Sequence, residues 1–209
     1  MTYPWMAPPF EMKPFEEMNK KDAKQHFDWY ISQIPERIEV LKELTEHKIS
    51  LDYSKESLIP LFAWYLSQIT IYKLSDKEIE AELEDLRQYP DFVYEDEKER
   101  LLANPVELKK EDYALAMDIA IYYAETIIKN YPQVKWTFFT KPKSFVYLNE
   151  PILSCEDDKI FYERNPRRLL HVIIQKIKEN QVGEQHLYNR FLSDASDILG
   201  EGEDDDEDE

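Results

Sequence analysis

Glycine is scarce in this chain, which has only Gly183, Gly200 and Gly202 among its 209 residues. The phosphate-binding loops of P-loop and Rossmann proteins need several glycines close together, because the backbone itself must approach the phosphates. No such cluster is present. The sequence therefore excludes these nucleotide-binding classes.

Cysteine is scarcer still, since Cys155 is the single one and no disulfide can form within the chain. A chain of this length with 43 % hydrophobic residues can bury enough surface to fold without such a bond. No apolar run approaches the ~20 residues of a membrane span, and residues 1–5 do not resemble a signal peptide. We predict a cytoplasmic protein that does not associate with membranes.

Motifs for catalysis or metal binding are also missing. No two of the four histidines stand at metal-ligand spacing, and no nucleophile elbow surrounds a serine. Cys155 precedes three acidic residues, which would raise its pKa and disfavour the reactive thiolate. Asp118 and Glu125 are expected on one face of a helix, where we interpret them as a polar edge rather than an acid–base pair. The sequence thus predicts a non-enzymatic protein with no cofactor and no metal.

Negative charge is abundant, with 44 acidic residues against 26 Lys plus Arg and a net charge of -18. Residues 76–99 hold eleven acids and three bases, or -8, and residues 201–209 hold eight acids and no base, or -8. The rest of the chain therefore carries only -2. Such a field repels nucleic acids and anionic membranes and attracts basic proteins, so we expect no direct nucleic-acid binding.

The chain is predicted to form a single globular domain over residues 1–200. Prolines alternate with aromatic residues near the N-terminus, so residues 1–17 are expected to form an extended arm packed across the domain. Residues 201–209 are expected to be a disordered acidic tail, because they cannot bury apolar area.

Hydrophobic periodicity predicts an α+β fold that is mainly α. The segment 112–131 is apolar nearly all round, as in a helix buried at the centre of a domain. Other helices are expected over 22–46, kinked or divided at Pro35, over 58–71, from Ser75 onward, and over 184–199. Between 89 and 105 we expect a loop with one short helix near 98–102.

Two aromatic and β-branched stretches, 135–139 and 143–148, predict a small antiparallel hairpin, with residues 152–153 as a possible third strand. Asn165 and Pro166 suit the first turn of a helix that we expect to be buried on most sides, with His171 as the most buried histidine. Arg164, Arg167 and Arg168 near its start suit either an anion site or, as we favour, internal pairing with acids.

Several short motifs carry a resemblance to a known group of proteins. They are Tyr131-Pro132-Gln133-Val134-Lys135-Trp136, Lys141-Pro142-Lys143, Asn149-Glu150-Pro151-Ile152-Leu153 and Asn165-Pro166-Arg167-Arg168. In these the C-terminal part of the chain resembles small acidic bacterial proteins of polymorphic toxin loci, which commonly act as immunity proteins. The resemblance implies an inhibitor of a cognate toxin and carries over no catalytic residue.

Charge and resemblance together predict a protein that binds and neutralises a basic partner protein. The predicted contact residues are Glu78, Glu82, Asp85, Asp91, Glu95, Asp96 and Glu97. Two alternatives remain open. A DNA mimic that inhibits DNA-binding defence proteins would use the same acids, whereas an adaptor or chaperone for basic proteins would depend on the tail.

Overall fold

The computed structural model describes residues 3–156 and 160–201, and its fold is mainly helical α+β, as the sequence predicts. The longer elements are α1 (Lys20–Leu44), α2 (Leu58–Gln68), α3 (Asp76–Leu86), α4 (Asp91–Ala103), α5 (Lys110–Asn130), α6 (Pro166–Lys178) and α7 (His186–Leu199). The strands are β1 (Ile71–Lys73), β2 (Val106–Leu108), β3 (Val134–Thr137), β4 (Ile152–Cys155) and β5 (Glu163–Arg164), and short 3-10 helices cover Phe15–Glu17 and Lys55–Ser57.

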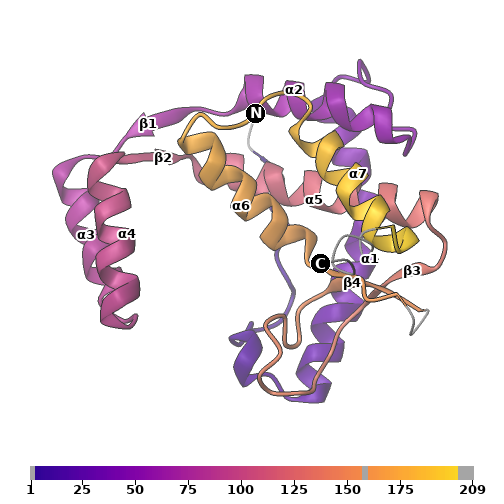
Figure 1. The fold of residues 1–209 in the computed structure, drawn as a ribbon, viewed down its shortest axis with the longest axis horizontal. Helices are drawn as coiled ribbons and strands as arrows, with labels where there is room; N and C mark the ends of the chain where they lie inside the picture. Colours follow the sequence, from indigo (N-terminus) through magenta and orange to yellow (C-terminus); the bar gives the residue numbers. More distant parts are fainter. Residues whose placement is uncertain (1–2, 157–159, 202–209) are drawn as a thin grey trace, which may run out of the picture.

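Helix α5 is the buried centre of the body, which confirms the prediction from its all-round apolar sequence. Every residue from Asp118 to Ala124 is buried. Helices α1 and α6 pack directly against α5, while α2 and α7 pack against each other at one end (Figure 1). One core therefore joins elements from residue 30 to residue 198.

Helix α1 continues through Pro35 as a single helix of 25 residues, so of the two outcomes expected there, a kink or a division, the division into two helices does not occur. A proline inside a helix removes one backbone hydrogen bond and disfavours helical geometry at the preceding residue. Here Ile34 and Ile38 on either side of it are buried in the core. We attribute the continuity to this packing, which offsets the local cost.

The predicted hairpin is wrong in its second strand. Strand β3 pairs antiparallel with β4, with Trp136 opposite Leu153, and β4 pairs in turn with β5. Residues 143–149 form turns instead. Pairing β3 with β4 buries Val134, Ile152 and Leu153 completely, whereas Val146 of the turn segment is largely exposed and offers no apolar face.

Helix α6 begins as predicted, with the Asn165 side chain accepting a hydrogen bond from the backbone N–H of Arg168 and with Pro166 in the first turn. It is not buried on most sides, however, since one face carries His171 and a Val172 side chain that is 54 % exposed. The expectation of a buried His171 is therefore wrong, and the buried histidine is His26 on α1.

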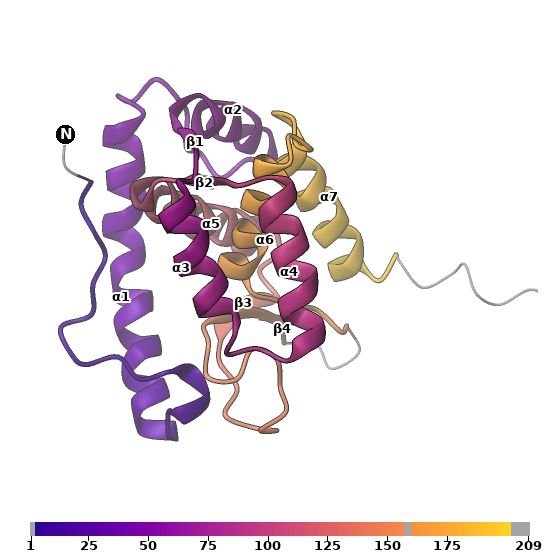
Figure 2. The ribbon, with the colours of Figure 1, turned by 90° about the vertical axis from the view of Figure 1, so that its left-hand side faces the viewer.

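The connection expected between residues 89 and 105 is instead mostly helix α4, which forms a hairpin with α3. Strands β1 and β2 pair antiparallel at the base of this hairpin, with Ile71 opposite Leu108. The α3–α4 hairpin stands beside the body rather than within it (Figures 1 and 2). None of the described residues of α3 or α4 is buried.

Candidate functional site

The α3–α4 hairpin is the first candidate site, and local signals explain its formation. Ser75 caps α3, because its hydroxyl accepts from the backbone N–H of Glu78 while the Glu78 carboxylate accepts from the backbone N–H of Ser75 at 2.8 Å. The Ser75 hydroxyl also donates to the Glu78 carboxylate at 2.6 Å, and this bond, together with the one from the Ser75 backbone N–H, lowers the pKa of Glu78. The apolar residues Ile79, Leu83 and Leu86 of α3 are only half-buried.

The base of the hairpin is fastened to helix α6. The Asn104 side-chain amide donates to the Lys178 backbone oxygen at 2.9 Å, and the Lys178 ammonium lies 3.2 Å from a Glu107 carboxylate oxygen. A cleft of about 600 Å³ separates the hairpin from α6 further along, lined in part by Glu82, Glu97 and Gln175. The attachment thus fixes the hairpin at one end and leaves the other end projecting.

All seven acids predicted to bind a partner lie on this hairpin. Helix α3 carries Glu78, Glu82 and Asp85, and α4 carries Asp91, Glu95, Asp96 and Glu97. Six are exposed and Glu97 is half-buried. Glu95 pairs with Lys98, while Asp96 and Glu97 both pair with Arg100. These pairs lie at the surface, where they contribute little stability.

Four of those acids, Glu78, Glu82, Asp85 and Asp91, make no ion pair with any residue in the described part of the chain. The excess negative charge of the hairpin is therefore exposed to solvent and is not neutralised by ion pairs within the described part of the protein. Whether these seven side chains contact a partner remains a prediction.

The projecting end of the hairpin also exposes aromatic side chains, which the sequence reading assigned to a loop. Tyr89, in the connection between α3 and α4, is 51 % exposed, and Phe92 at the start of α4 is 78 % exposed. Exposed aromatic residues near charged ones are typical of protein-binding interfaces. In the sequence, the only indication that Tyr89 and Phe92 are exposed is that they flank Pro90 and Asp91, which are common in turns and at helix starts.

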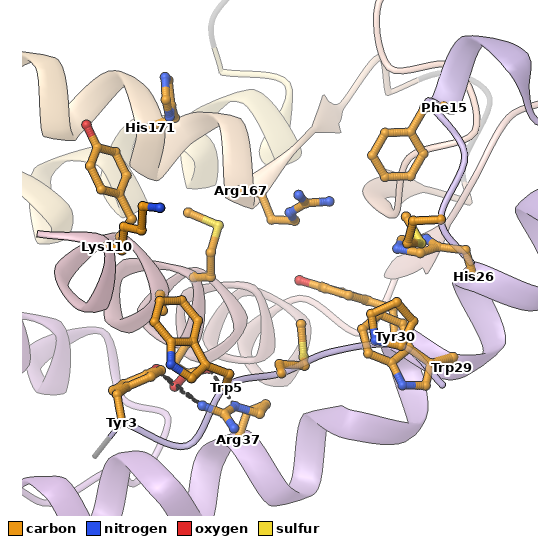
Figure 3. A pocket seen from close by; sticks show the side chains of 17 residues that line it. Tyr3, Trp5, Phe15, His26, Trp29, Tyr30, Arg37, Lys110, Arg167 and His171 are labelled. Atoms are coloured by element: carbon orange, nitrogen blue, oxygen red, sulfur yellow. Dashed lines mark hydrogen bonds and ion pairs between the residues drawn. The ribbon is translucent and has the colours of Figure 1, made fainter. Parts of the chain in front are cut away.

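A cavity on the body is the second candidate site (Figure 3). Its volume is about 560 Å³, and it lies between the N-terminal arm, α1, α5 and α6. Its walls are mostly aromatic and thioether side chains: Tyr3, Trp5, Met6, Met12, Phe15, Trp29, Tyr30, Tyr113 and Met117. Sequence reasoning missed this cavity, because its residues come from four separate segments.

The arm is tied to the floor of this cavity by a buried ion pair. The Arg37 guanidinium donates to both Asp118 oxygens, at 2.7 and 2.6 Å, and to the Pro4 backbone oxygen at 2.8 Å. The Tyr3 hydroxyl donates to Asp118 as well. Burial raises the pKa of Asp118, and the Arg37 guanidinium opposes that rise. Asp118 is thus a structural anchor.

Arg167 differs from its two arginine neighbours, which pair internally as favoured from the sequence. Arg164 contacts Asp194 at 2.8 Å, and Arg168 contacts Glu150 at 2.6 Å. Arg167 makes no ion pair with any described residue, and it points from α6 into the cavity (Figure 3). It lies 5.7 Å from the centre of the Phe15 ring.

His26 and Tyr30 bring two further polar atoms to the same cavity. His26 is 3 % exposed and Tyr30 is 2 % exposed, and no described residue hydrogen-bonds to His26 Nδ1 or to the Tyr30 hydroxyl. Burial lowers the pKa of His26 to about 4, with the nearby Arg167 charge acting in the same direction. Burial raises the pKa of Tyr30. At neutral pH both side chains are therefore uncharged.

The remaining sequence candidates are separated in space or in role. Glu125 accepts a hydrogen bond from the Trp136 ring N–H at 2.9 Å, so it serves a different contact from Asp118. Within residues 3–156 and 160–201, no group of three or more His, Cys, Asp or Glu side chains is arranged to hold a metal ion. No helix in these ranges is both long and apolar enough to span a membrane. Residues 202–209 of the predicted tail lie outside the described residues.

Comparison with known proteins supplies no relative. No known protein family, no curated protein and no solved structure matches the chain. The resemblance to immunity proteins accordingly stays a prediction.

Proposed function

We propose that the protein binds a basic protein partner through the α3–α4 hairpin and thereby neutralises it, in the manner of a cytoplasmic immunity protein. One observation carries the proposal. The segment with the densest folded negative charge stands clear of the body and exposes Tyr89 and Phe92 at its projecting end.

The charge and the aromatic residues have different roles in this proposal. Exposed carboxylates around an interface chiefly accelerate association with a basic surface and make the rate sensitive to salt. Aromatic side chains that become fully covered supply most of the affinity and slow dissociation. A partner with a basic surface around an apolar pocket would fit both features.

A capture experiment followed by binding kinetics tests this proposal. The bait is the full chain, incubated with native cell lysate at low and moderate salt, and the captured proteins are identified by mass spectrometry. A dominant captured protein is then purified, and its association and dissociation rates are measured by surface plasmon resonance over a range of salt concentrations.

Two matched charge variants separate the hairpin from the overall charge. Glu82→Lys with Asp85→Lys changes the hairpin, and Glu36→Lys with Glu43→Lys makes the same net change on exposed positions of α1. None of these four acids forms an ion pair with a described residue, so folding should be little affected. Only the hairpin variant should slow association, by about tenfold at low salt.

A third variant, Phe92→Ser, tests the aromatic contact. It should accelerate dissociation at least tenfold while leaving the association rate nearly unchanged, because it keeps the charge. Equal effects of the two charge variants on a single partner would reject the hairpin as the binding surface.

The same experiment distinguishes the alternatives. Capture of several DNA-binding proteins through the hairpin would favour a DNA mimic. Loss of binding on deletion of residues after Gly200, with the hairpin variants without effect, would favour an adaptor that acts through its tail.

A further inference from the structure

The cavity between the arm, α1, α5 and α6 has the size and wall chemistry of a small-molecule site. Its volume of about 560 Å³ lies within the ~300–1,000 Å³ that such pockets usually have. Six of its lining residues are tyrosine, tryptophan or phenylalanine, which favour planar aromatic ligands through stacked and edge-on contacts. Three methionines add side chains that adapt to ligand shape.

Two buried polar atoms beside this cavity have no hydrogen-bond partner among the described residues. A buried polar group without a hydrogen bond costs folding free energy, so such groups are rare and call for an explanation. The Tyr30 hydroxyl points toward the open centre of the cavity, and His26 lies on the same side (Figure 3). A molecule bound beside them would supply the hydrogen bonds that they lack.

Two cations that line the cavity, Arg167 and Lys110, form no ion pair with any described residue. The Arg37 charge in the floor is matched by Asp118, whereas Arg167 has no carboxylate partner among the described residues. Arg167 points into the space that the Tyr30 hydroxyl also faces (Figure 3). A chain with a net charge of -18 thus keeps one guanidinium uncompensated at an aromatic cavity.

We propose that this cavity binds a small molecule with an aromatic ring system and one anionic group. The rings pack between the tryptophan, tyrosine and phenylalanine side chains, and the anionic group accepts hydrogen bonds from Arg167 and the Tyr30 hydroxyl. His26, uncharged at neutral pH, offers a further hydrogen bond.

The N-terminal arm limits what can bind. Trp5 and Met6 form one wall, and the arm is fastened below them by the Tyr3–Asp118 and Arg37–Pro4 hydrogen bonds. This wall favours a molecule that fits within the cavity over an extended polypeptide that would have to run past it. The inference is independent of the hairpin and of any protein partner.

The test compares 1-naphthaleneacetate with 1-naphthaleneacetamide, which share the ring system and differ in charge. Binding is measured by isothermal titration calorimetry and by quenching of tryptophan fluorescence, since Trp5 and Trp29 line the cavity. The acetate should bind the wild-type protein at least tenfold more tightly than the amide. The overall field of the protein opposes this preference, so it would report a local cation.

Three variants locate the site. Arg167→Gln should abolish the preference for the acetate, whereas Lys176→Gln, an equal charge loss at an exposed position of α6, should leave it unchanged. Tyr30→Phe should weaken acetate binding several-fold without lowering the urea midpoint, because it removes a hydroxyl that has no partner in the part of the chain that the structure describes. A purely structural Tyr30 would not give that combination.

Three results would overturn the proposal: no binding of either compound at millimolar concentration, equal binding of the acetate and the amide, or equal effects of Arg167→Gln and Lys176→Gln. A preference that disappears only with Arg167→Gln would support it.

Discussion

The body around α5 and the α3–α4 hairpin follow opposite designs. Helix α5 buries residues on every side, and even Asp118, one of its four acidic residues, is paired inside the protein. The hairpin buries none of its described helical residues and leaves its excess charge in solvent. The contrast teaches that the buried surface that stabilises the fold lies in the body, whereas the hairpin contributes little of it. Four predictions sharpen this contrast, from the largest expected effect to the smallest.

Breaking the Arg37–Asp118 ion pair should have the largest effect on stability. Asp118→Ala leaves a buried guanidinium without its counterion, which should lower the free energy of unfolding by about 3–5 kcal/mol. Urea denaturation followed by circular dichroism measures this loss. The double variant Arg37→Met with Asp118→Leu removes both charges and should be more stable than Asp118→Ala alone; an equal or greater loss would argue against an unpaired charge as the cause.

Truncating one aliphatic side chain in each region should show how much that region contributes to the free energy of unfolding. Ile119→Ala in α5 removes a fully buried side chain and should cost about 2–5 kcal/mol of unfolding free energy. Leu83→Ala in α3 removes a half-buried one and should cost about 1 kcal/mol or less. Similar losses for the two variants, measured by urea denaturation, would show that the hairpin shares the stability of the core.

Protonation of His26, which is buried in the body, should make the free energy of unfolding depend on pH. Its folded-state pKa of about 4 lies below the ordinary value of 6.5, so in this window the unfolded chain binds the proton more readily. Stability should therefore fall as the pH drops from 6.5 toward 4. The fall should be shallower in His26→Phe, in urea titrations at several pH values; parallel curves for the two proteins would contradict this origin.

Removing the hairpin should have the smallest effect on the stability of the protein. Replacing residues 74–105 with Asn-Gly, a favoured two-residue turn, would join β1 to β2. The urea midpoint should stay near that of the full chain, because the deletion removes few buried side chains, chiefly Leu74. A large drop, or loss of a cooperative transition, would mean that the base contacts of Asn104 and Lys178 hold the body together.

The sequence predicts those parts of the fold whose signals are local. The apolar run of α5, the cap at Ser75 and the Asn165–Pro166 helix start each act within a few residues, and the structure contains all three. Where packing between distant segments decides the local structure, the sequence is a poorer guide: the division allowed at Pro35 does not occur, and the strand expected over 143–148 is wrong. Pro35 stays helical because Ile34 and Ile38 are buried against the core, and β3 pairs with β4 because that pairing buries Ile152 and Leu153.

The candidate sites show the same division. Charge counts locate the acidic segment, because net charge does not depend on the fold, but they miss helix α4 and the exposure of Phe92. The cavity could not be predicted, since it requires the arm, α1 and α5 to meet α6 in space. The sequence singles out Arg167 only as one of three arginines; its lack of a partner appears in three dimensions.

The short β1–β2 ribbon has an evolutionary consequence. The chain leaves the body at Ile71 and returns at Leu108, its partner in the ribbon, so the two ends of the excursion are neighbours. Recombination or insertion between these points can therefore exchange the hairpin alone. The hairpin can change during evolution while the fold of the body is kept.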